Sequence, residues 1–353
     1  MADWAATNTI HEYEYYTVDP GTWKEVKRLT TVKSCSITRD WEADTLGSAS
    51  IDADEIFGEC YIRVYLIVTQ EGVSEKFPLG TYLVQTPSSS FDGKVTSSTL
   101  DAYTPLIELK ENQPPLGYFV AENADTMGTA AKLTAEHLRA PVVAATSSNR
   151  MYKDFVANGD DTWMTFLSDL VASADFCFDL DEMGRVLFAP KQDTASLQPV
   201  WTYNDDNSSI LYPEITVDHD LYGIPNVIEV VYSDSNDMYV ARAVNDDENS
   251  PISTIKRGRE IVQRIENPDL SGVPTQAMIN DYAQKQLKEV STLEYTISYK
   301  HAYNGVRIGD CVRLNYTRFG LEGIKARVTN QTIECEPGCP VSEKAVFTQR
   351  LWR

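Results

Sequence analysis

The sequence predicts a mainly β protein with an α+β insert. Short apolar segments separated by Gly or Pro turns fill the first 112 residues, two capped amphipathic helices follow, and strand-like segments return after residue 200. At 353 residues the chain is also too long for one ordinary core. We therefore expect three domains, which comprise residues 1–112, 113–200 and 201–353.

The first domain is predicted to contain only strands. The segment Cys60–Gln70 alternates at first and then becomes continuously apolar, which is typical of a central strand. Strands this short and evenly spaced indicate a barrel or a sandwich. The expected strands are Tyr13–Val18, Ser34–Asp40, Gly47–Ile56, Cys60–Gln70, Glu75–Pro87 and Lys94–Tyr103.

The second domain is predicted to be α+β, with two helices and a hairpin. Asp125 can cap the first helix and Asp161 the second. Phe176–Leu180 and Val186–Ala189 would then pair across a turn at Asp181–Gly184. The apolar face of the first helix would hold Met127, Ala131, Ala135 and Leu138. That of the second would hold Trp163, Phe166, Leu167, Leu170 and Val171.

The third domain is predicted to return to strands, with one helix at Thr275–Val290. A similar pattern occurs in Leu79–Val84 and in Ile308–Leu314, where a Gly is followed by a predicted strand. In both places a second Gly and a strand that contains Val-Thr come next. This weak repeat indicates two related β-domains, and chance is the open alternative. The expected strands are Pro225–Ser233, Met238–Asn245, Glu294–Tyr303, Val306–Tyr316 and Lys325–Cys335.

The charge of the chain excludes several classes of protein. Its 52 acidic and 31 basic residues give a net charge of −21, and the acidic excess occurs in all three predicted domains. A basic nucleic-acid-binding domain and a separate acidic tail are therefore excluded. No apolar run approaches 18 residues and the N-terminus lacks the pattern of a signal peptide, so we expect no membrane span. The six scattered cysteines are expected to be buried free thiols.

Two short motifs resemble metal sites, and each has a simpler explanation. Asp179–Gly184 is similar to a calcium loop, but Met183 stands where an oxygen ligand is needed, so we expect a hairpin turn. Cys335 and Cys339 have a spacing that zinc could use, but the remaining ligands would have to come from distant His residues. Two thiols across a hairpin explain that pair, and no metal or cofactor is predicted.

No catalytic site is predicted either. None of His11, His137, His219 and His301 lies in a recognisable motif, and His219 is expected at the surface. Glycine-rich phosphate loops are absent from the sequence. Asp and Glu are too numerous for their spacing to single out a glycosidase pair. A cell-wall glycan hydrolase and a small-ligand or carbohydrate-binding β-protein stay open as alternatives.

With the β, α+β, β order in place, the chain resembles the phage tail hub family, also called baseplate hubs. The resemblance rests on the helix and hairpin in Gly159–Pro190 and on the segment Pro225–Ile261. The helix Thr275–Val290 and the strand at Val306–Tyr316 complete it. Residues 1–60 match only in their strand pattern. The pattern residues of the second segment are Ser250, Pro251, Ser253, Gly258, Arg259 and Ile261.

This resemblance implies two tail-tube-like β-barrel domains flanking a small α+β domain, in a protein that is not an enzyme. It implies a homotrimer at the distal tip of a bacteriophage tail, in the virion after assembly in the host cytoplasm. The implied partners are a distal tail protein or tail tube protein, the tape measure protein and a central tail fibre or spike. Phage DNA would pass through the channel without specific binding. The alternative is the hub of a phage-derived contractile injection particle.

Overall fold

The structure is a computed structural model that describes residues 2–6, 8–55, 57–206, 209–218, 221–233, 238–268 and 275–351. The chain divides into two compact units. The large unit comprises Met1–Ile215 and Ser298–Ala345, and the small unit comprises Thr216–Ile297 and Val346–Arg353. The boundary between the two units falls inside the third predicted domain, residues 201–353. The predicted domain boundaries at residues 112 and 200 stay predictions.

The large unit contains most of one extended sheet, which confirms the prediction of a mainly β chain. Its first half has the strand order β2-β1-β5-β6-β7-β4-β3 with antiparallel pairing throughout. The central position predicted for Cys60–Gln70 is confirmed, because β5 lies between β1 and β6. The strands are β1 (Thr9–Val18), β2 (Glu25–Leu29), β3 (Val32–Asp40), β4 (Gly47–Ala53), β5 (Cys60–Gln70), β6 (Val73–Phe91) and β7 (Thr96–Tyr103).

The second half of the sheet contains more strands than the sequence predicts. β18 pairs antiparallel with β19 and parallel with β12, while β20 lies between β19 and β17. β12, β13 and β20 were not expected, and neither was β2 in the first half. The strands are β12 (Trp201–Asn204), β13 (Leu211–Asp218), β17 (Thr292–Ala302), β18 (Cys311–Tyr316), β19 (Leu321–Glu334) and β20 (Pro340–Arg350), and η1 (Thr317–Phe319) is a short 3-10 helix.

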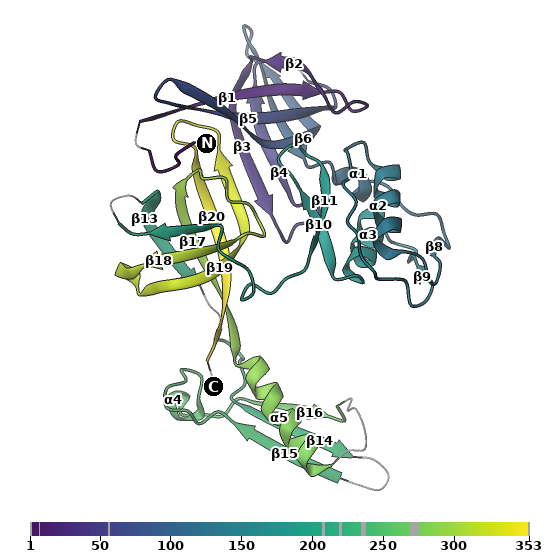
Figure 1. Cartoon of the computed structure of the whole chain (residues 1–353), viewed down its shortest axis with the longest axis vertical. Helices are drawn as coiled ribbons and strands as arrows, with labels where there is room; N and C mark the ends of the chain where they lie inside the picture. The colour runs from purple at the N-terminus through teal and green to yellow at the C-terminus, as the bar shows by residue number, and fades with distance from the viewer. Residues whose placement is uncertain are drawn as a thin grey trace. The chain divides into compact units, whose positions relative to one another are not determined.

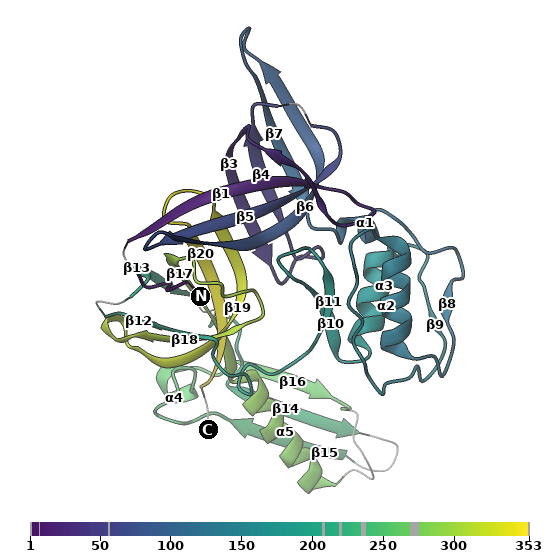
Figure 2. The same ribbon diagram turned by 45° about the horizontal axis from the view of Figure 1, so that its top comes forward.

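A single ladder joins the two halves of the sheet, and we call it the seam. In the seam, residues Ser36–Asp40 of β3 pair antiparallel with Asn330–Glu334 of β19. Figures 1 and 2 show the first half in purple and blue and the second half in teal to yellow. Within the described residues the pairing path ends at β2, β12 and β13, so it does not close either half into a ring.

The predicted helices and hairpin of the insert are confirmed, with one change to a helix face. Asp125 caps α2 by accepting a hydrogen bond from the Gly128 backbone nitrogen at 3.2 Å. Ala135 is exposed, whereas Thr134 is buried. Thr134 follows Met127 by seven residues, so the two side chains point within about 20° of each other around the helix axis. Ala135 follows Met127 by eight residues, so its side chain points about 80° away. The elements are α1 (Ile107–Lys110), β8 (Phe119–Val120), α2 (Thr126–His137), β9 (Phe155–Val156), α3 (Trp163–Ala172), β10 (Phe176–Leu180) and β11 (Val186–Pro190).

The cap of α3 lies one residue later than predicted. The Thr162 hydroxyl accepts from the Thr165 backbone nitrogen at 3.2 Å, while the Asp161 carboxylate accepts from the Asn158 nitrogen at 2.7 Å. Asp161 therefore holds the preceding loop and is not the N-cap of the helix. The predicted face is confirmed, since all of its members are buried: Trp163, Phe166, Leu167, Leu170 and Val171.

The small unit packs the predicted helix α5 on a three-stranded sheet of order β15-β14-β16 (Figure 1). Thr275 caps α5, whose buried residues Ile279, Ala283 and Leu287 share a core with β14 and β15. The turn predicted before Met238 lies outside the described residues. The elements are β14 (Val227–Ser233), β15 (Met238–Val244), α4 (Thr254–Arg257), β16 (Val262–Glu266) and α5 (Gln276–Val290).

In the part of the chain that the structure describes, no helix is both long enough and apolar enough to cross a membrane.

Candidate functional site

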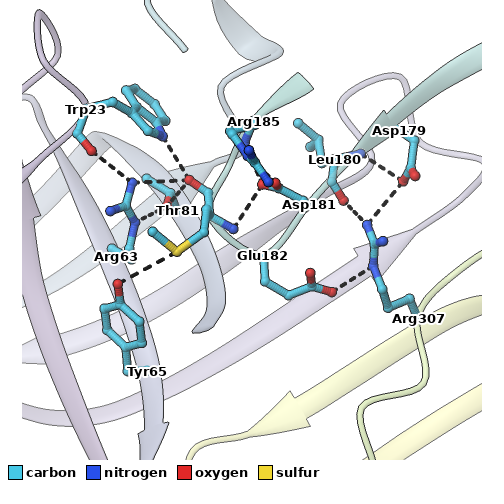
Figure 3. A network of polar contacts seen from close by, with 11 residues as sticks. Trp23, Arg63, Tyr65, Thr81, Asp179, Leu180, Asp181, Glu182, Arg185 and Arg307 are labelled. Carbon is cyan, nitrogen blue, oxygen red and sulfur yellow. Dashed lines mark hydrogen bonds and ion pairs between the residues drawn. The ribbon is translucent and has the colours of Figure 1, made fainter. Parts of the chain in front are cut away.

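The hairpin of β10 and β11 presents its turn, Asp181–Gly184, to the first half of the sheet, and we call β10, β11 and this turn the docked hairpin (Figure 3). The Gly184 backbone nitrogen donates to the Asp181 carbonyl oxygen at 2.9 Å. The Asp181 carboxylate accepts from the backbone nitrogens of Met183 at 3.0 Å and Arg185 at 2.8 Å. These bonds confirm the predicted hairpin turn, because the acidic side chain holds its own backbone.

The Met183 carbonyl oxygen fixes the docked hairpin to the sheet. It accepts from Trp23 Nε1 at 2.8 Å, Thr81 Oγ1 at 3.0 Å and Arg63 Nη2 at 3.1 Å. These donors come from the β1–β2 turn, β6 and β5. Arg63 is only 2% exposed and lies 3.7 Å from the Glu25 carboxylate. A charged donor strengthens the contact, and the acidic neighbour offsets part of the cost of burying the guanidinium.

Arg307 holds the other side of the docked hairpin. It belongs to the loop between β17 and β18, in the second half of the sheet. Its Nε lies 2.7 Å from Glu182, and its Nη2 lies 3.4 Å from Asp179 and donates to the Leu180 carbonyl. Burial raises the pKa of Asp179, and Arg307 opposes that shift. The docked hairpin thus contacts both halves of the sheet through one buried and one half-buried arginine.

Two cavities lie beside this contact. One of about 240 Å³ is lined by Asp179, Arg307 and Asp310, among other residues. The other has a volume of about 40 Å³. Its lining includes Arg39, Thr81, Tyr82, Glu182 and Arg307. The polar groups at this contact connect parts of the large unit through hydrogen bonds and ion pairs.

Replacing Gly184 with alanine is expected to lower the free energy of unfolding by about 2–3 kcal/mol. Gly184 has a φ of +75°, and a Cβ there would lie 2.7 Å from Thr81 Cβ. Gly117 is a matched control because it has a φ of +76° but nothing within 4 Å of its Cβ position. Its substitution should cost about 1 kcal/mol, from backbone strain alone. Urea denaturation measures both, and equal losses would contradict close packing of the turn on β6.

A second polar cluster lies inside the second half of the sheet, around Glu343 on β20. The Tyr299 hydroxyl and Gln331 Nε2 both donate to its carboxylate, the latter at 2.6 Å. His301 Nε2 lies 3.2 Å from the same carboxylate and 3.2 Å from the Tyr203 hydroxyl. The pKa of Tyr299 is raised well above its ordinary value. Burial is the larger cause, and the negative charge of Glu343 is the next. We call these five residues the Glu343 cluster.

The Glu343 cluster has residue types used in catalysis but no access for a substrate. His301 and Glu343 are each 1% exposed. The cluster instead continues across the seam, since Arg39 on β3 donates to Gln331 at 3.4 Å and to the Leu79 carbonyl at 2.8 Å. It therefore cross-links strands from both halves. The sequence contains one indication of this cluster. Glu343 lies between Val341 and Ala345 in the alternating pattern of a strand, so it shares the inward-facing side of the strand with these two apolar residues.

The other residues considered from the sequence lie on several different elements. His11 lies on β1 and His137 stacks on Trp163 with ring centroids 3.9 Å apart, and burial lowers the pKa of both histidines. His219 lies outside the described residues. Cys335 and Cys339 are free thiols, as are the other four cysteines. Among the described residues, no three potential ligand side chains are grouped to hold a metal.

Comparisons with known proteins find a likeness in fold. No family model and no curated protein matches the sequence. A tail protein from Neisseria meningitidis MC58 is 13% identical with a TM-score of 0.60, and the match covers 96% of this chain and 98% of that one. The 43 kDa tail protein of prophage MuSo2 from Shewanella oneidensis is 12% identical with a TM-score of 0.59, over 95% and 98%.

A chain of the Francisella PdpA–VgrG complex is 7% identical with a TM-score of 0.57, and this chain spans 97% of its own length but 53% of that chain. The resemblance to phage tail proteins is thereby confirmed in the fold, which the chain shares with the Neisseria and Shewanella tail proteins over nearly its whole length.

Proposed function

We propose that the chain is a structural protein of a bacteriophage tail or baseplate. The observation that carries this proposal is the shared fold with two tail proteins, which covers nearly all of each chain. The interior also supports a structural role. The docked hairpin and the Glu343 cluster use their polar groups to connect strands, and the cluster is buried.

We further propose that the chain is the trimeric hub at the distal tail tip. Each chain would contribute the two halves of its sheet as tube-like barrel domains, and three chains would place six such halves around a channel. The weak sequence repeat supports this arrangement. One segment lies within β6, the first strand of the antiparallel hairpin β6–β7, and the other runs into β18, the first strand of the hairpin β18–β19.

The acidic balance suits a channel through which DNA passes. A net charge of −21 repels phosphate, so it opposes specific binding of the genome during ejection. As a hub, the chain would join the distal tail protein or tail tube protein to a central tail fibre or spike and would meet the tape measure protein. It would be assembled in the host cytoplasm and remain at the tail tip of the virion.

The second candidate is the hub of a phage-derived contractile injection particle. The likeness to a chain of the Francisella PdpA–VgrG complex favours it. That chain is longer, and this sequence spans about half of it. The two candidates share the same trimeric arrangement and differ in the particle that contains the protein.

The solution mass of the purified chain tests the trimer. Size-exclusion chromatography with light scattering should give three times the 39.6 kDa chain mass for the chain alone, or a complex that contains three copies of the chain after mixing with a distal tail protein. A chain that stays monomeric in both conditions would contradict the hub. Turnover of peptidoglycan that one Asp or Glu to Ala substitution abolishes would support the hydrolase alternative instead.

A further inference from the structure

Two cysteines lie opposite each other at one end of the seam. The ladder pairs Ile37 with Ile333 and Ser36 with Glu334, so its next step brings Cys335 opposite Cys35. The Cys335 backbone nitrogen donates to the Cys35 carbonyl oxygen at 2.9 Å, which extends the ladder to this pair. The two residues are therefore cross-strand neighbours although they are far apart in the sequence.

Both thiols point to the same side of the sheet. Side chains alternate between faces along a strand, so Cys35 shares a face with Ile37, and Cys335 shares it with Ile333. Both isoleucines are fully buried in the core that contains Cys35, and Cys335 packs against this core. Cβ atoms of opposite residues in an antiparallel pair are about 4.5–5.5 Å apart, and a disulfide needs about 3.5–4.5 Å. A shift of about 1 Å is enough to bridge them.

We propose that Cys35 and Cys335 are a covalent cross-link site, at which a disulfide forms when the protein meets a low-molecular-weight disulfide oxidant. One thiol loses its proton and attacks the oxidant, which releases one thiolate and leaves a mixed disulfide. The second thiol then displaces the second oxidant thiolate. Two cysteine thiols are oxidised, and the oxidant disulfide is reduced to two thiols. Cys335 makes the first attack because it is half-buried, whereas Cys35 is 4% exposed.

The reaction is expected to be slow at neutral pH. Contact with the Cys35 thiol, followed by burial, raises the pKa of Cys335 well above its ordinary value. The thiolate is the attacking species, so the rate should increase as the pH rises. This explains how the pair stays reduced in a cytosol and closes later, after longer exposure to oxidising surroundings.

The cross-link would lie where it constrains the fold most. Among the described residues, the seam is the ladder that joins the two halves of the sheet. A bridge between segments so distant in sequence closes a very long loop, which strongly restricts the unfolded chain. The competing pair, Cys335 with Cys339, would close only a short turn and would leave the seam unchanged.

Peptide mapping of the oxidised full chain tests the proposal. The protein is incubated with oxidised glutathione at alkaline pH, free thiols are blocked, and trypsin and a Glu-specific protease are applied. Pro337 blocks cleavage after Glu336, so Cys335 and Cys339 stay on one fragment, and tandem mass spectrometry of the linked peptides identifies which of the two carries the bond. We expect the peptide Ser34–Arg39 to be joined to the fragment that carries Cys335. Linkage of Cys335 to Cys339, or glutathione adducts with Cys35 free, would overturn the proposal.

Variants and thermal unfolding provide a second readout. The oxidised protein should unfold at a temperature about 5 °C higher than the reduced protein, and dithiothreitol should reverse the shift. Cys339→Ser should keep both the linkage and the shift, whereas Cys335→Ser should lose both. The peptide map of the unsubstituted chain remains decisive if a variant fails to fold. A shift that persists in Cys335→Ser would contradict the assignment.

Discussion

Replacing Arg63 with alanine is expected to lower the free energy of unfolding of the large unit by about 3 kcal/mol. The substitution removes a charged donor from the Met183 carbonyl and another from Thr81, and it leaves a cavity in β5 because the side chain is buried. The docked hairpin should then separate more readily from the sheet. Urea denaturation measures the loss, and hydrogen exchange at the turn Asp181–Gly184 measures the separation.

Arg185 provides the matched control for this prediction. It belongs to the docked hairpin and pairs with Asp181 at 2.5 Å, but its side chain is 52% exposed. Exposed pairs contribute little, so Arg185→Ala should cost less than about 1 kcal/mol. Equal losses for the two variants, or unchanged hydrogen exchange at the turn in Arg63→Ala, would contradict the role of Arg63 in docking.

Replacing Glu343 with alanine is expected to cost about 3–4 kcal/mol, because it removes the acceptor that three buried side chains share. Tyr299, His301 and Gln331 would each lose a partner in a region that water does not reach. Thermal and urea unfolding measure the loss. The control is Glu322→Ala on β19, since Glu322 is exposed and should change stability by less than about 0.5 kcal/mol. A loss for Glu343→Ala no larger than the control would show that the cluster does not stabilise the sheet.

Strands whose apolar pattern is clear were predictable, and strands that break the pattern were not. β4 alternates Ala49, Ile51 and Ala53 toward the core, and all three are buried as expected. β2 is exposed along nearly its whole length, so it has no apolar face to identify it. β20 was missed because Glu343 occupies an inward position. A buried carboxylate is tolerated only with partners from other strands, and these are not visible in a local pattern.

The candidate site was predictable only in part, for a similar reason. The Asp and Gly residues of the turn at Asp181–Gly184 indicate a turn, and the structure confirms it. What the turn contacts depends on Trp23, Arg63 and Arg307, which are distant in sequence. One local signal does exist, because Arg63 interrupts the apolar run of β5. A charged residue inside a central strand indicates a buried polar partner.

Electron microscopy of complete particles with this chain labelled tests the hub proposal most directly. We expect three copies around the axis at the distal tip of the tail, with the two halves of each sheet contributing to a ring of six around the channel. Absence of the label from the tail, or a copy number that does not fit three-fold symmetry at the tip, would contradict the proposal.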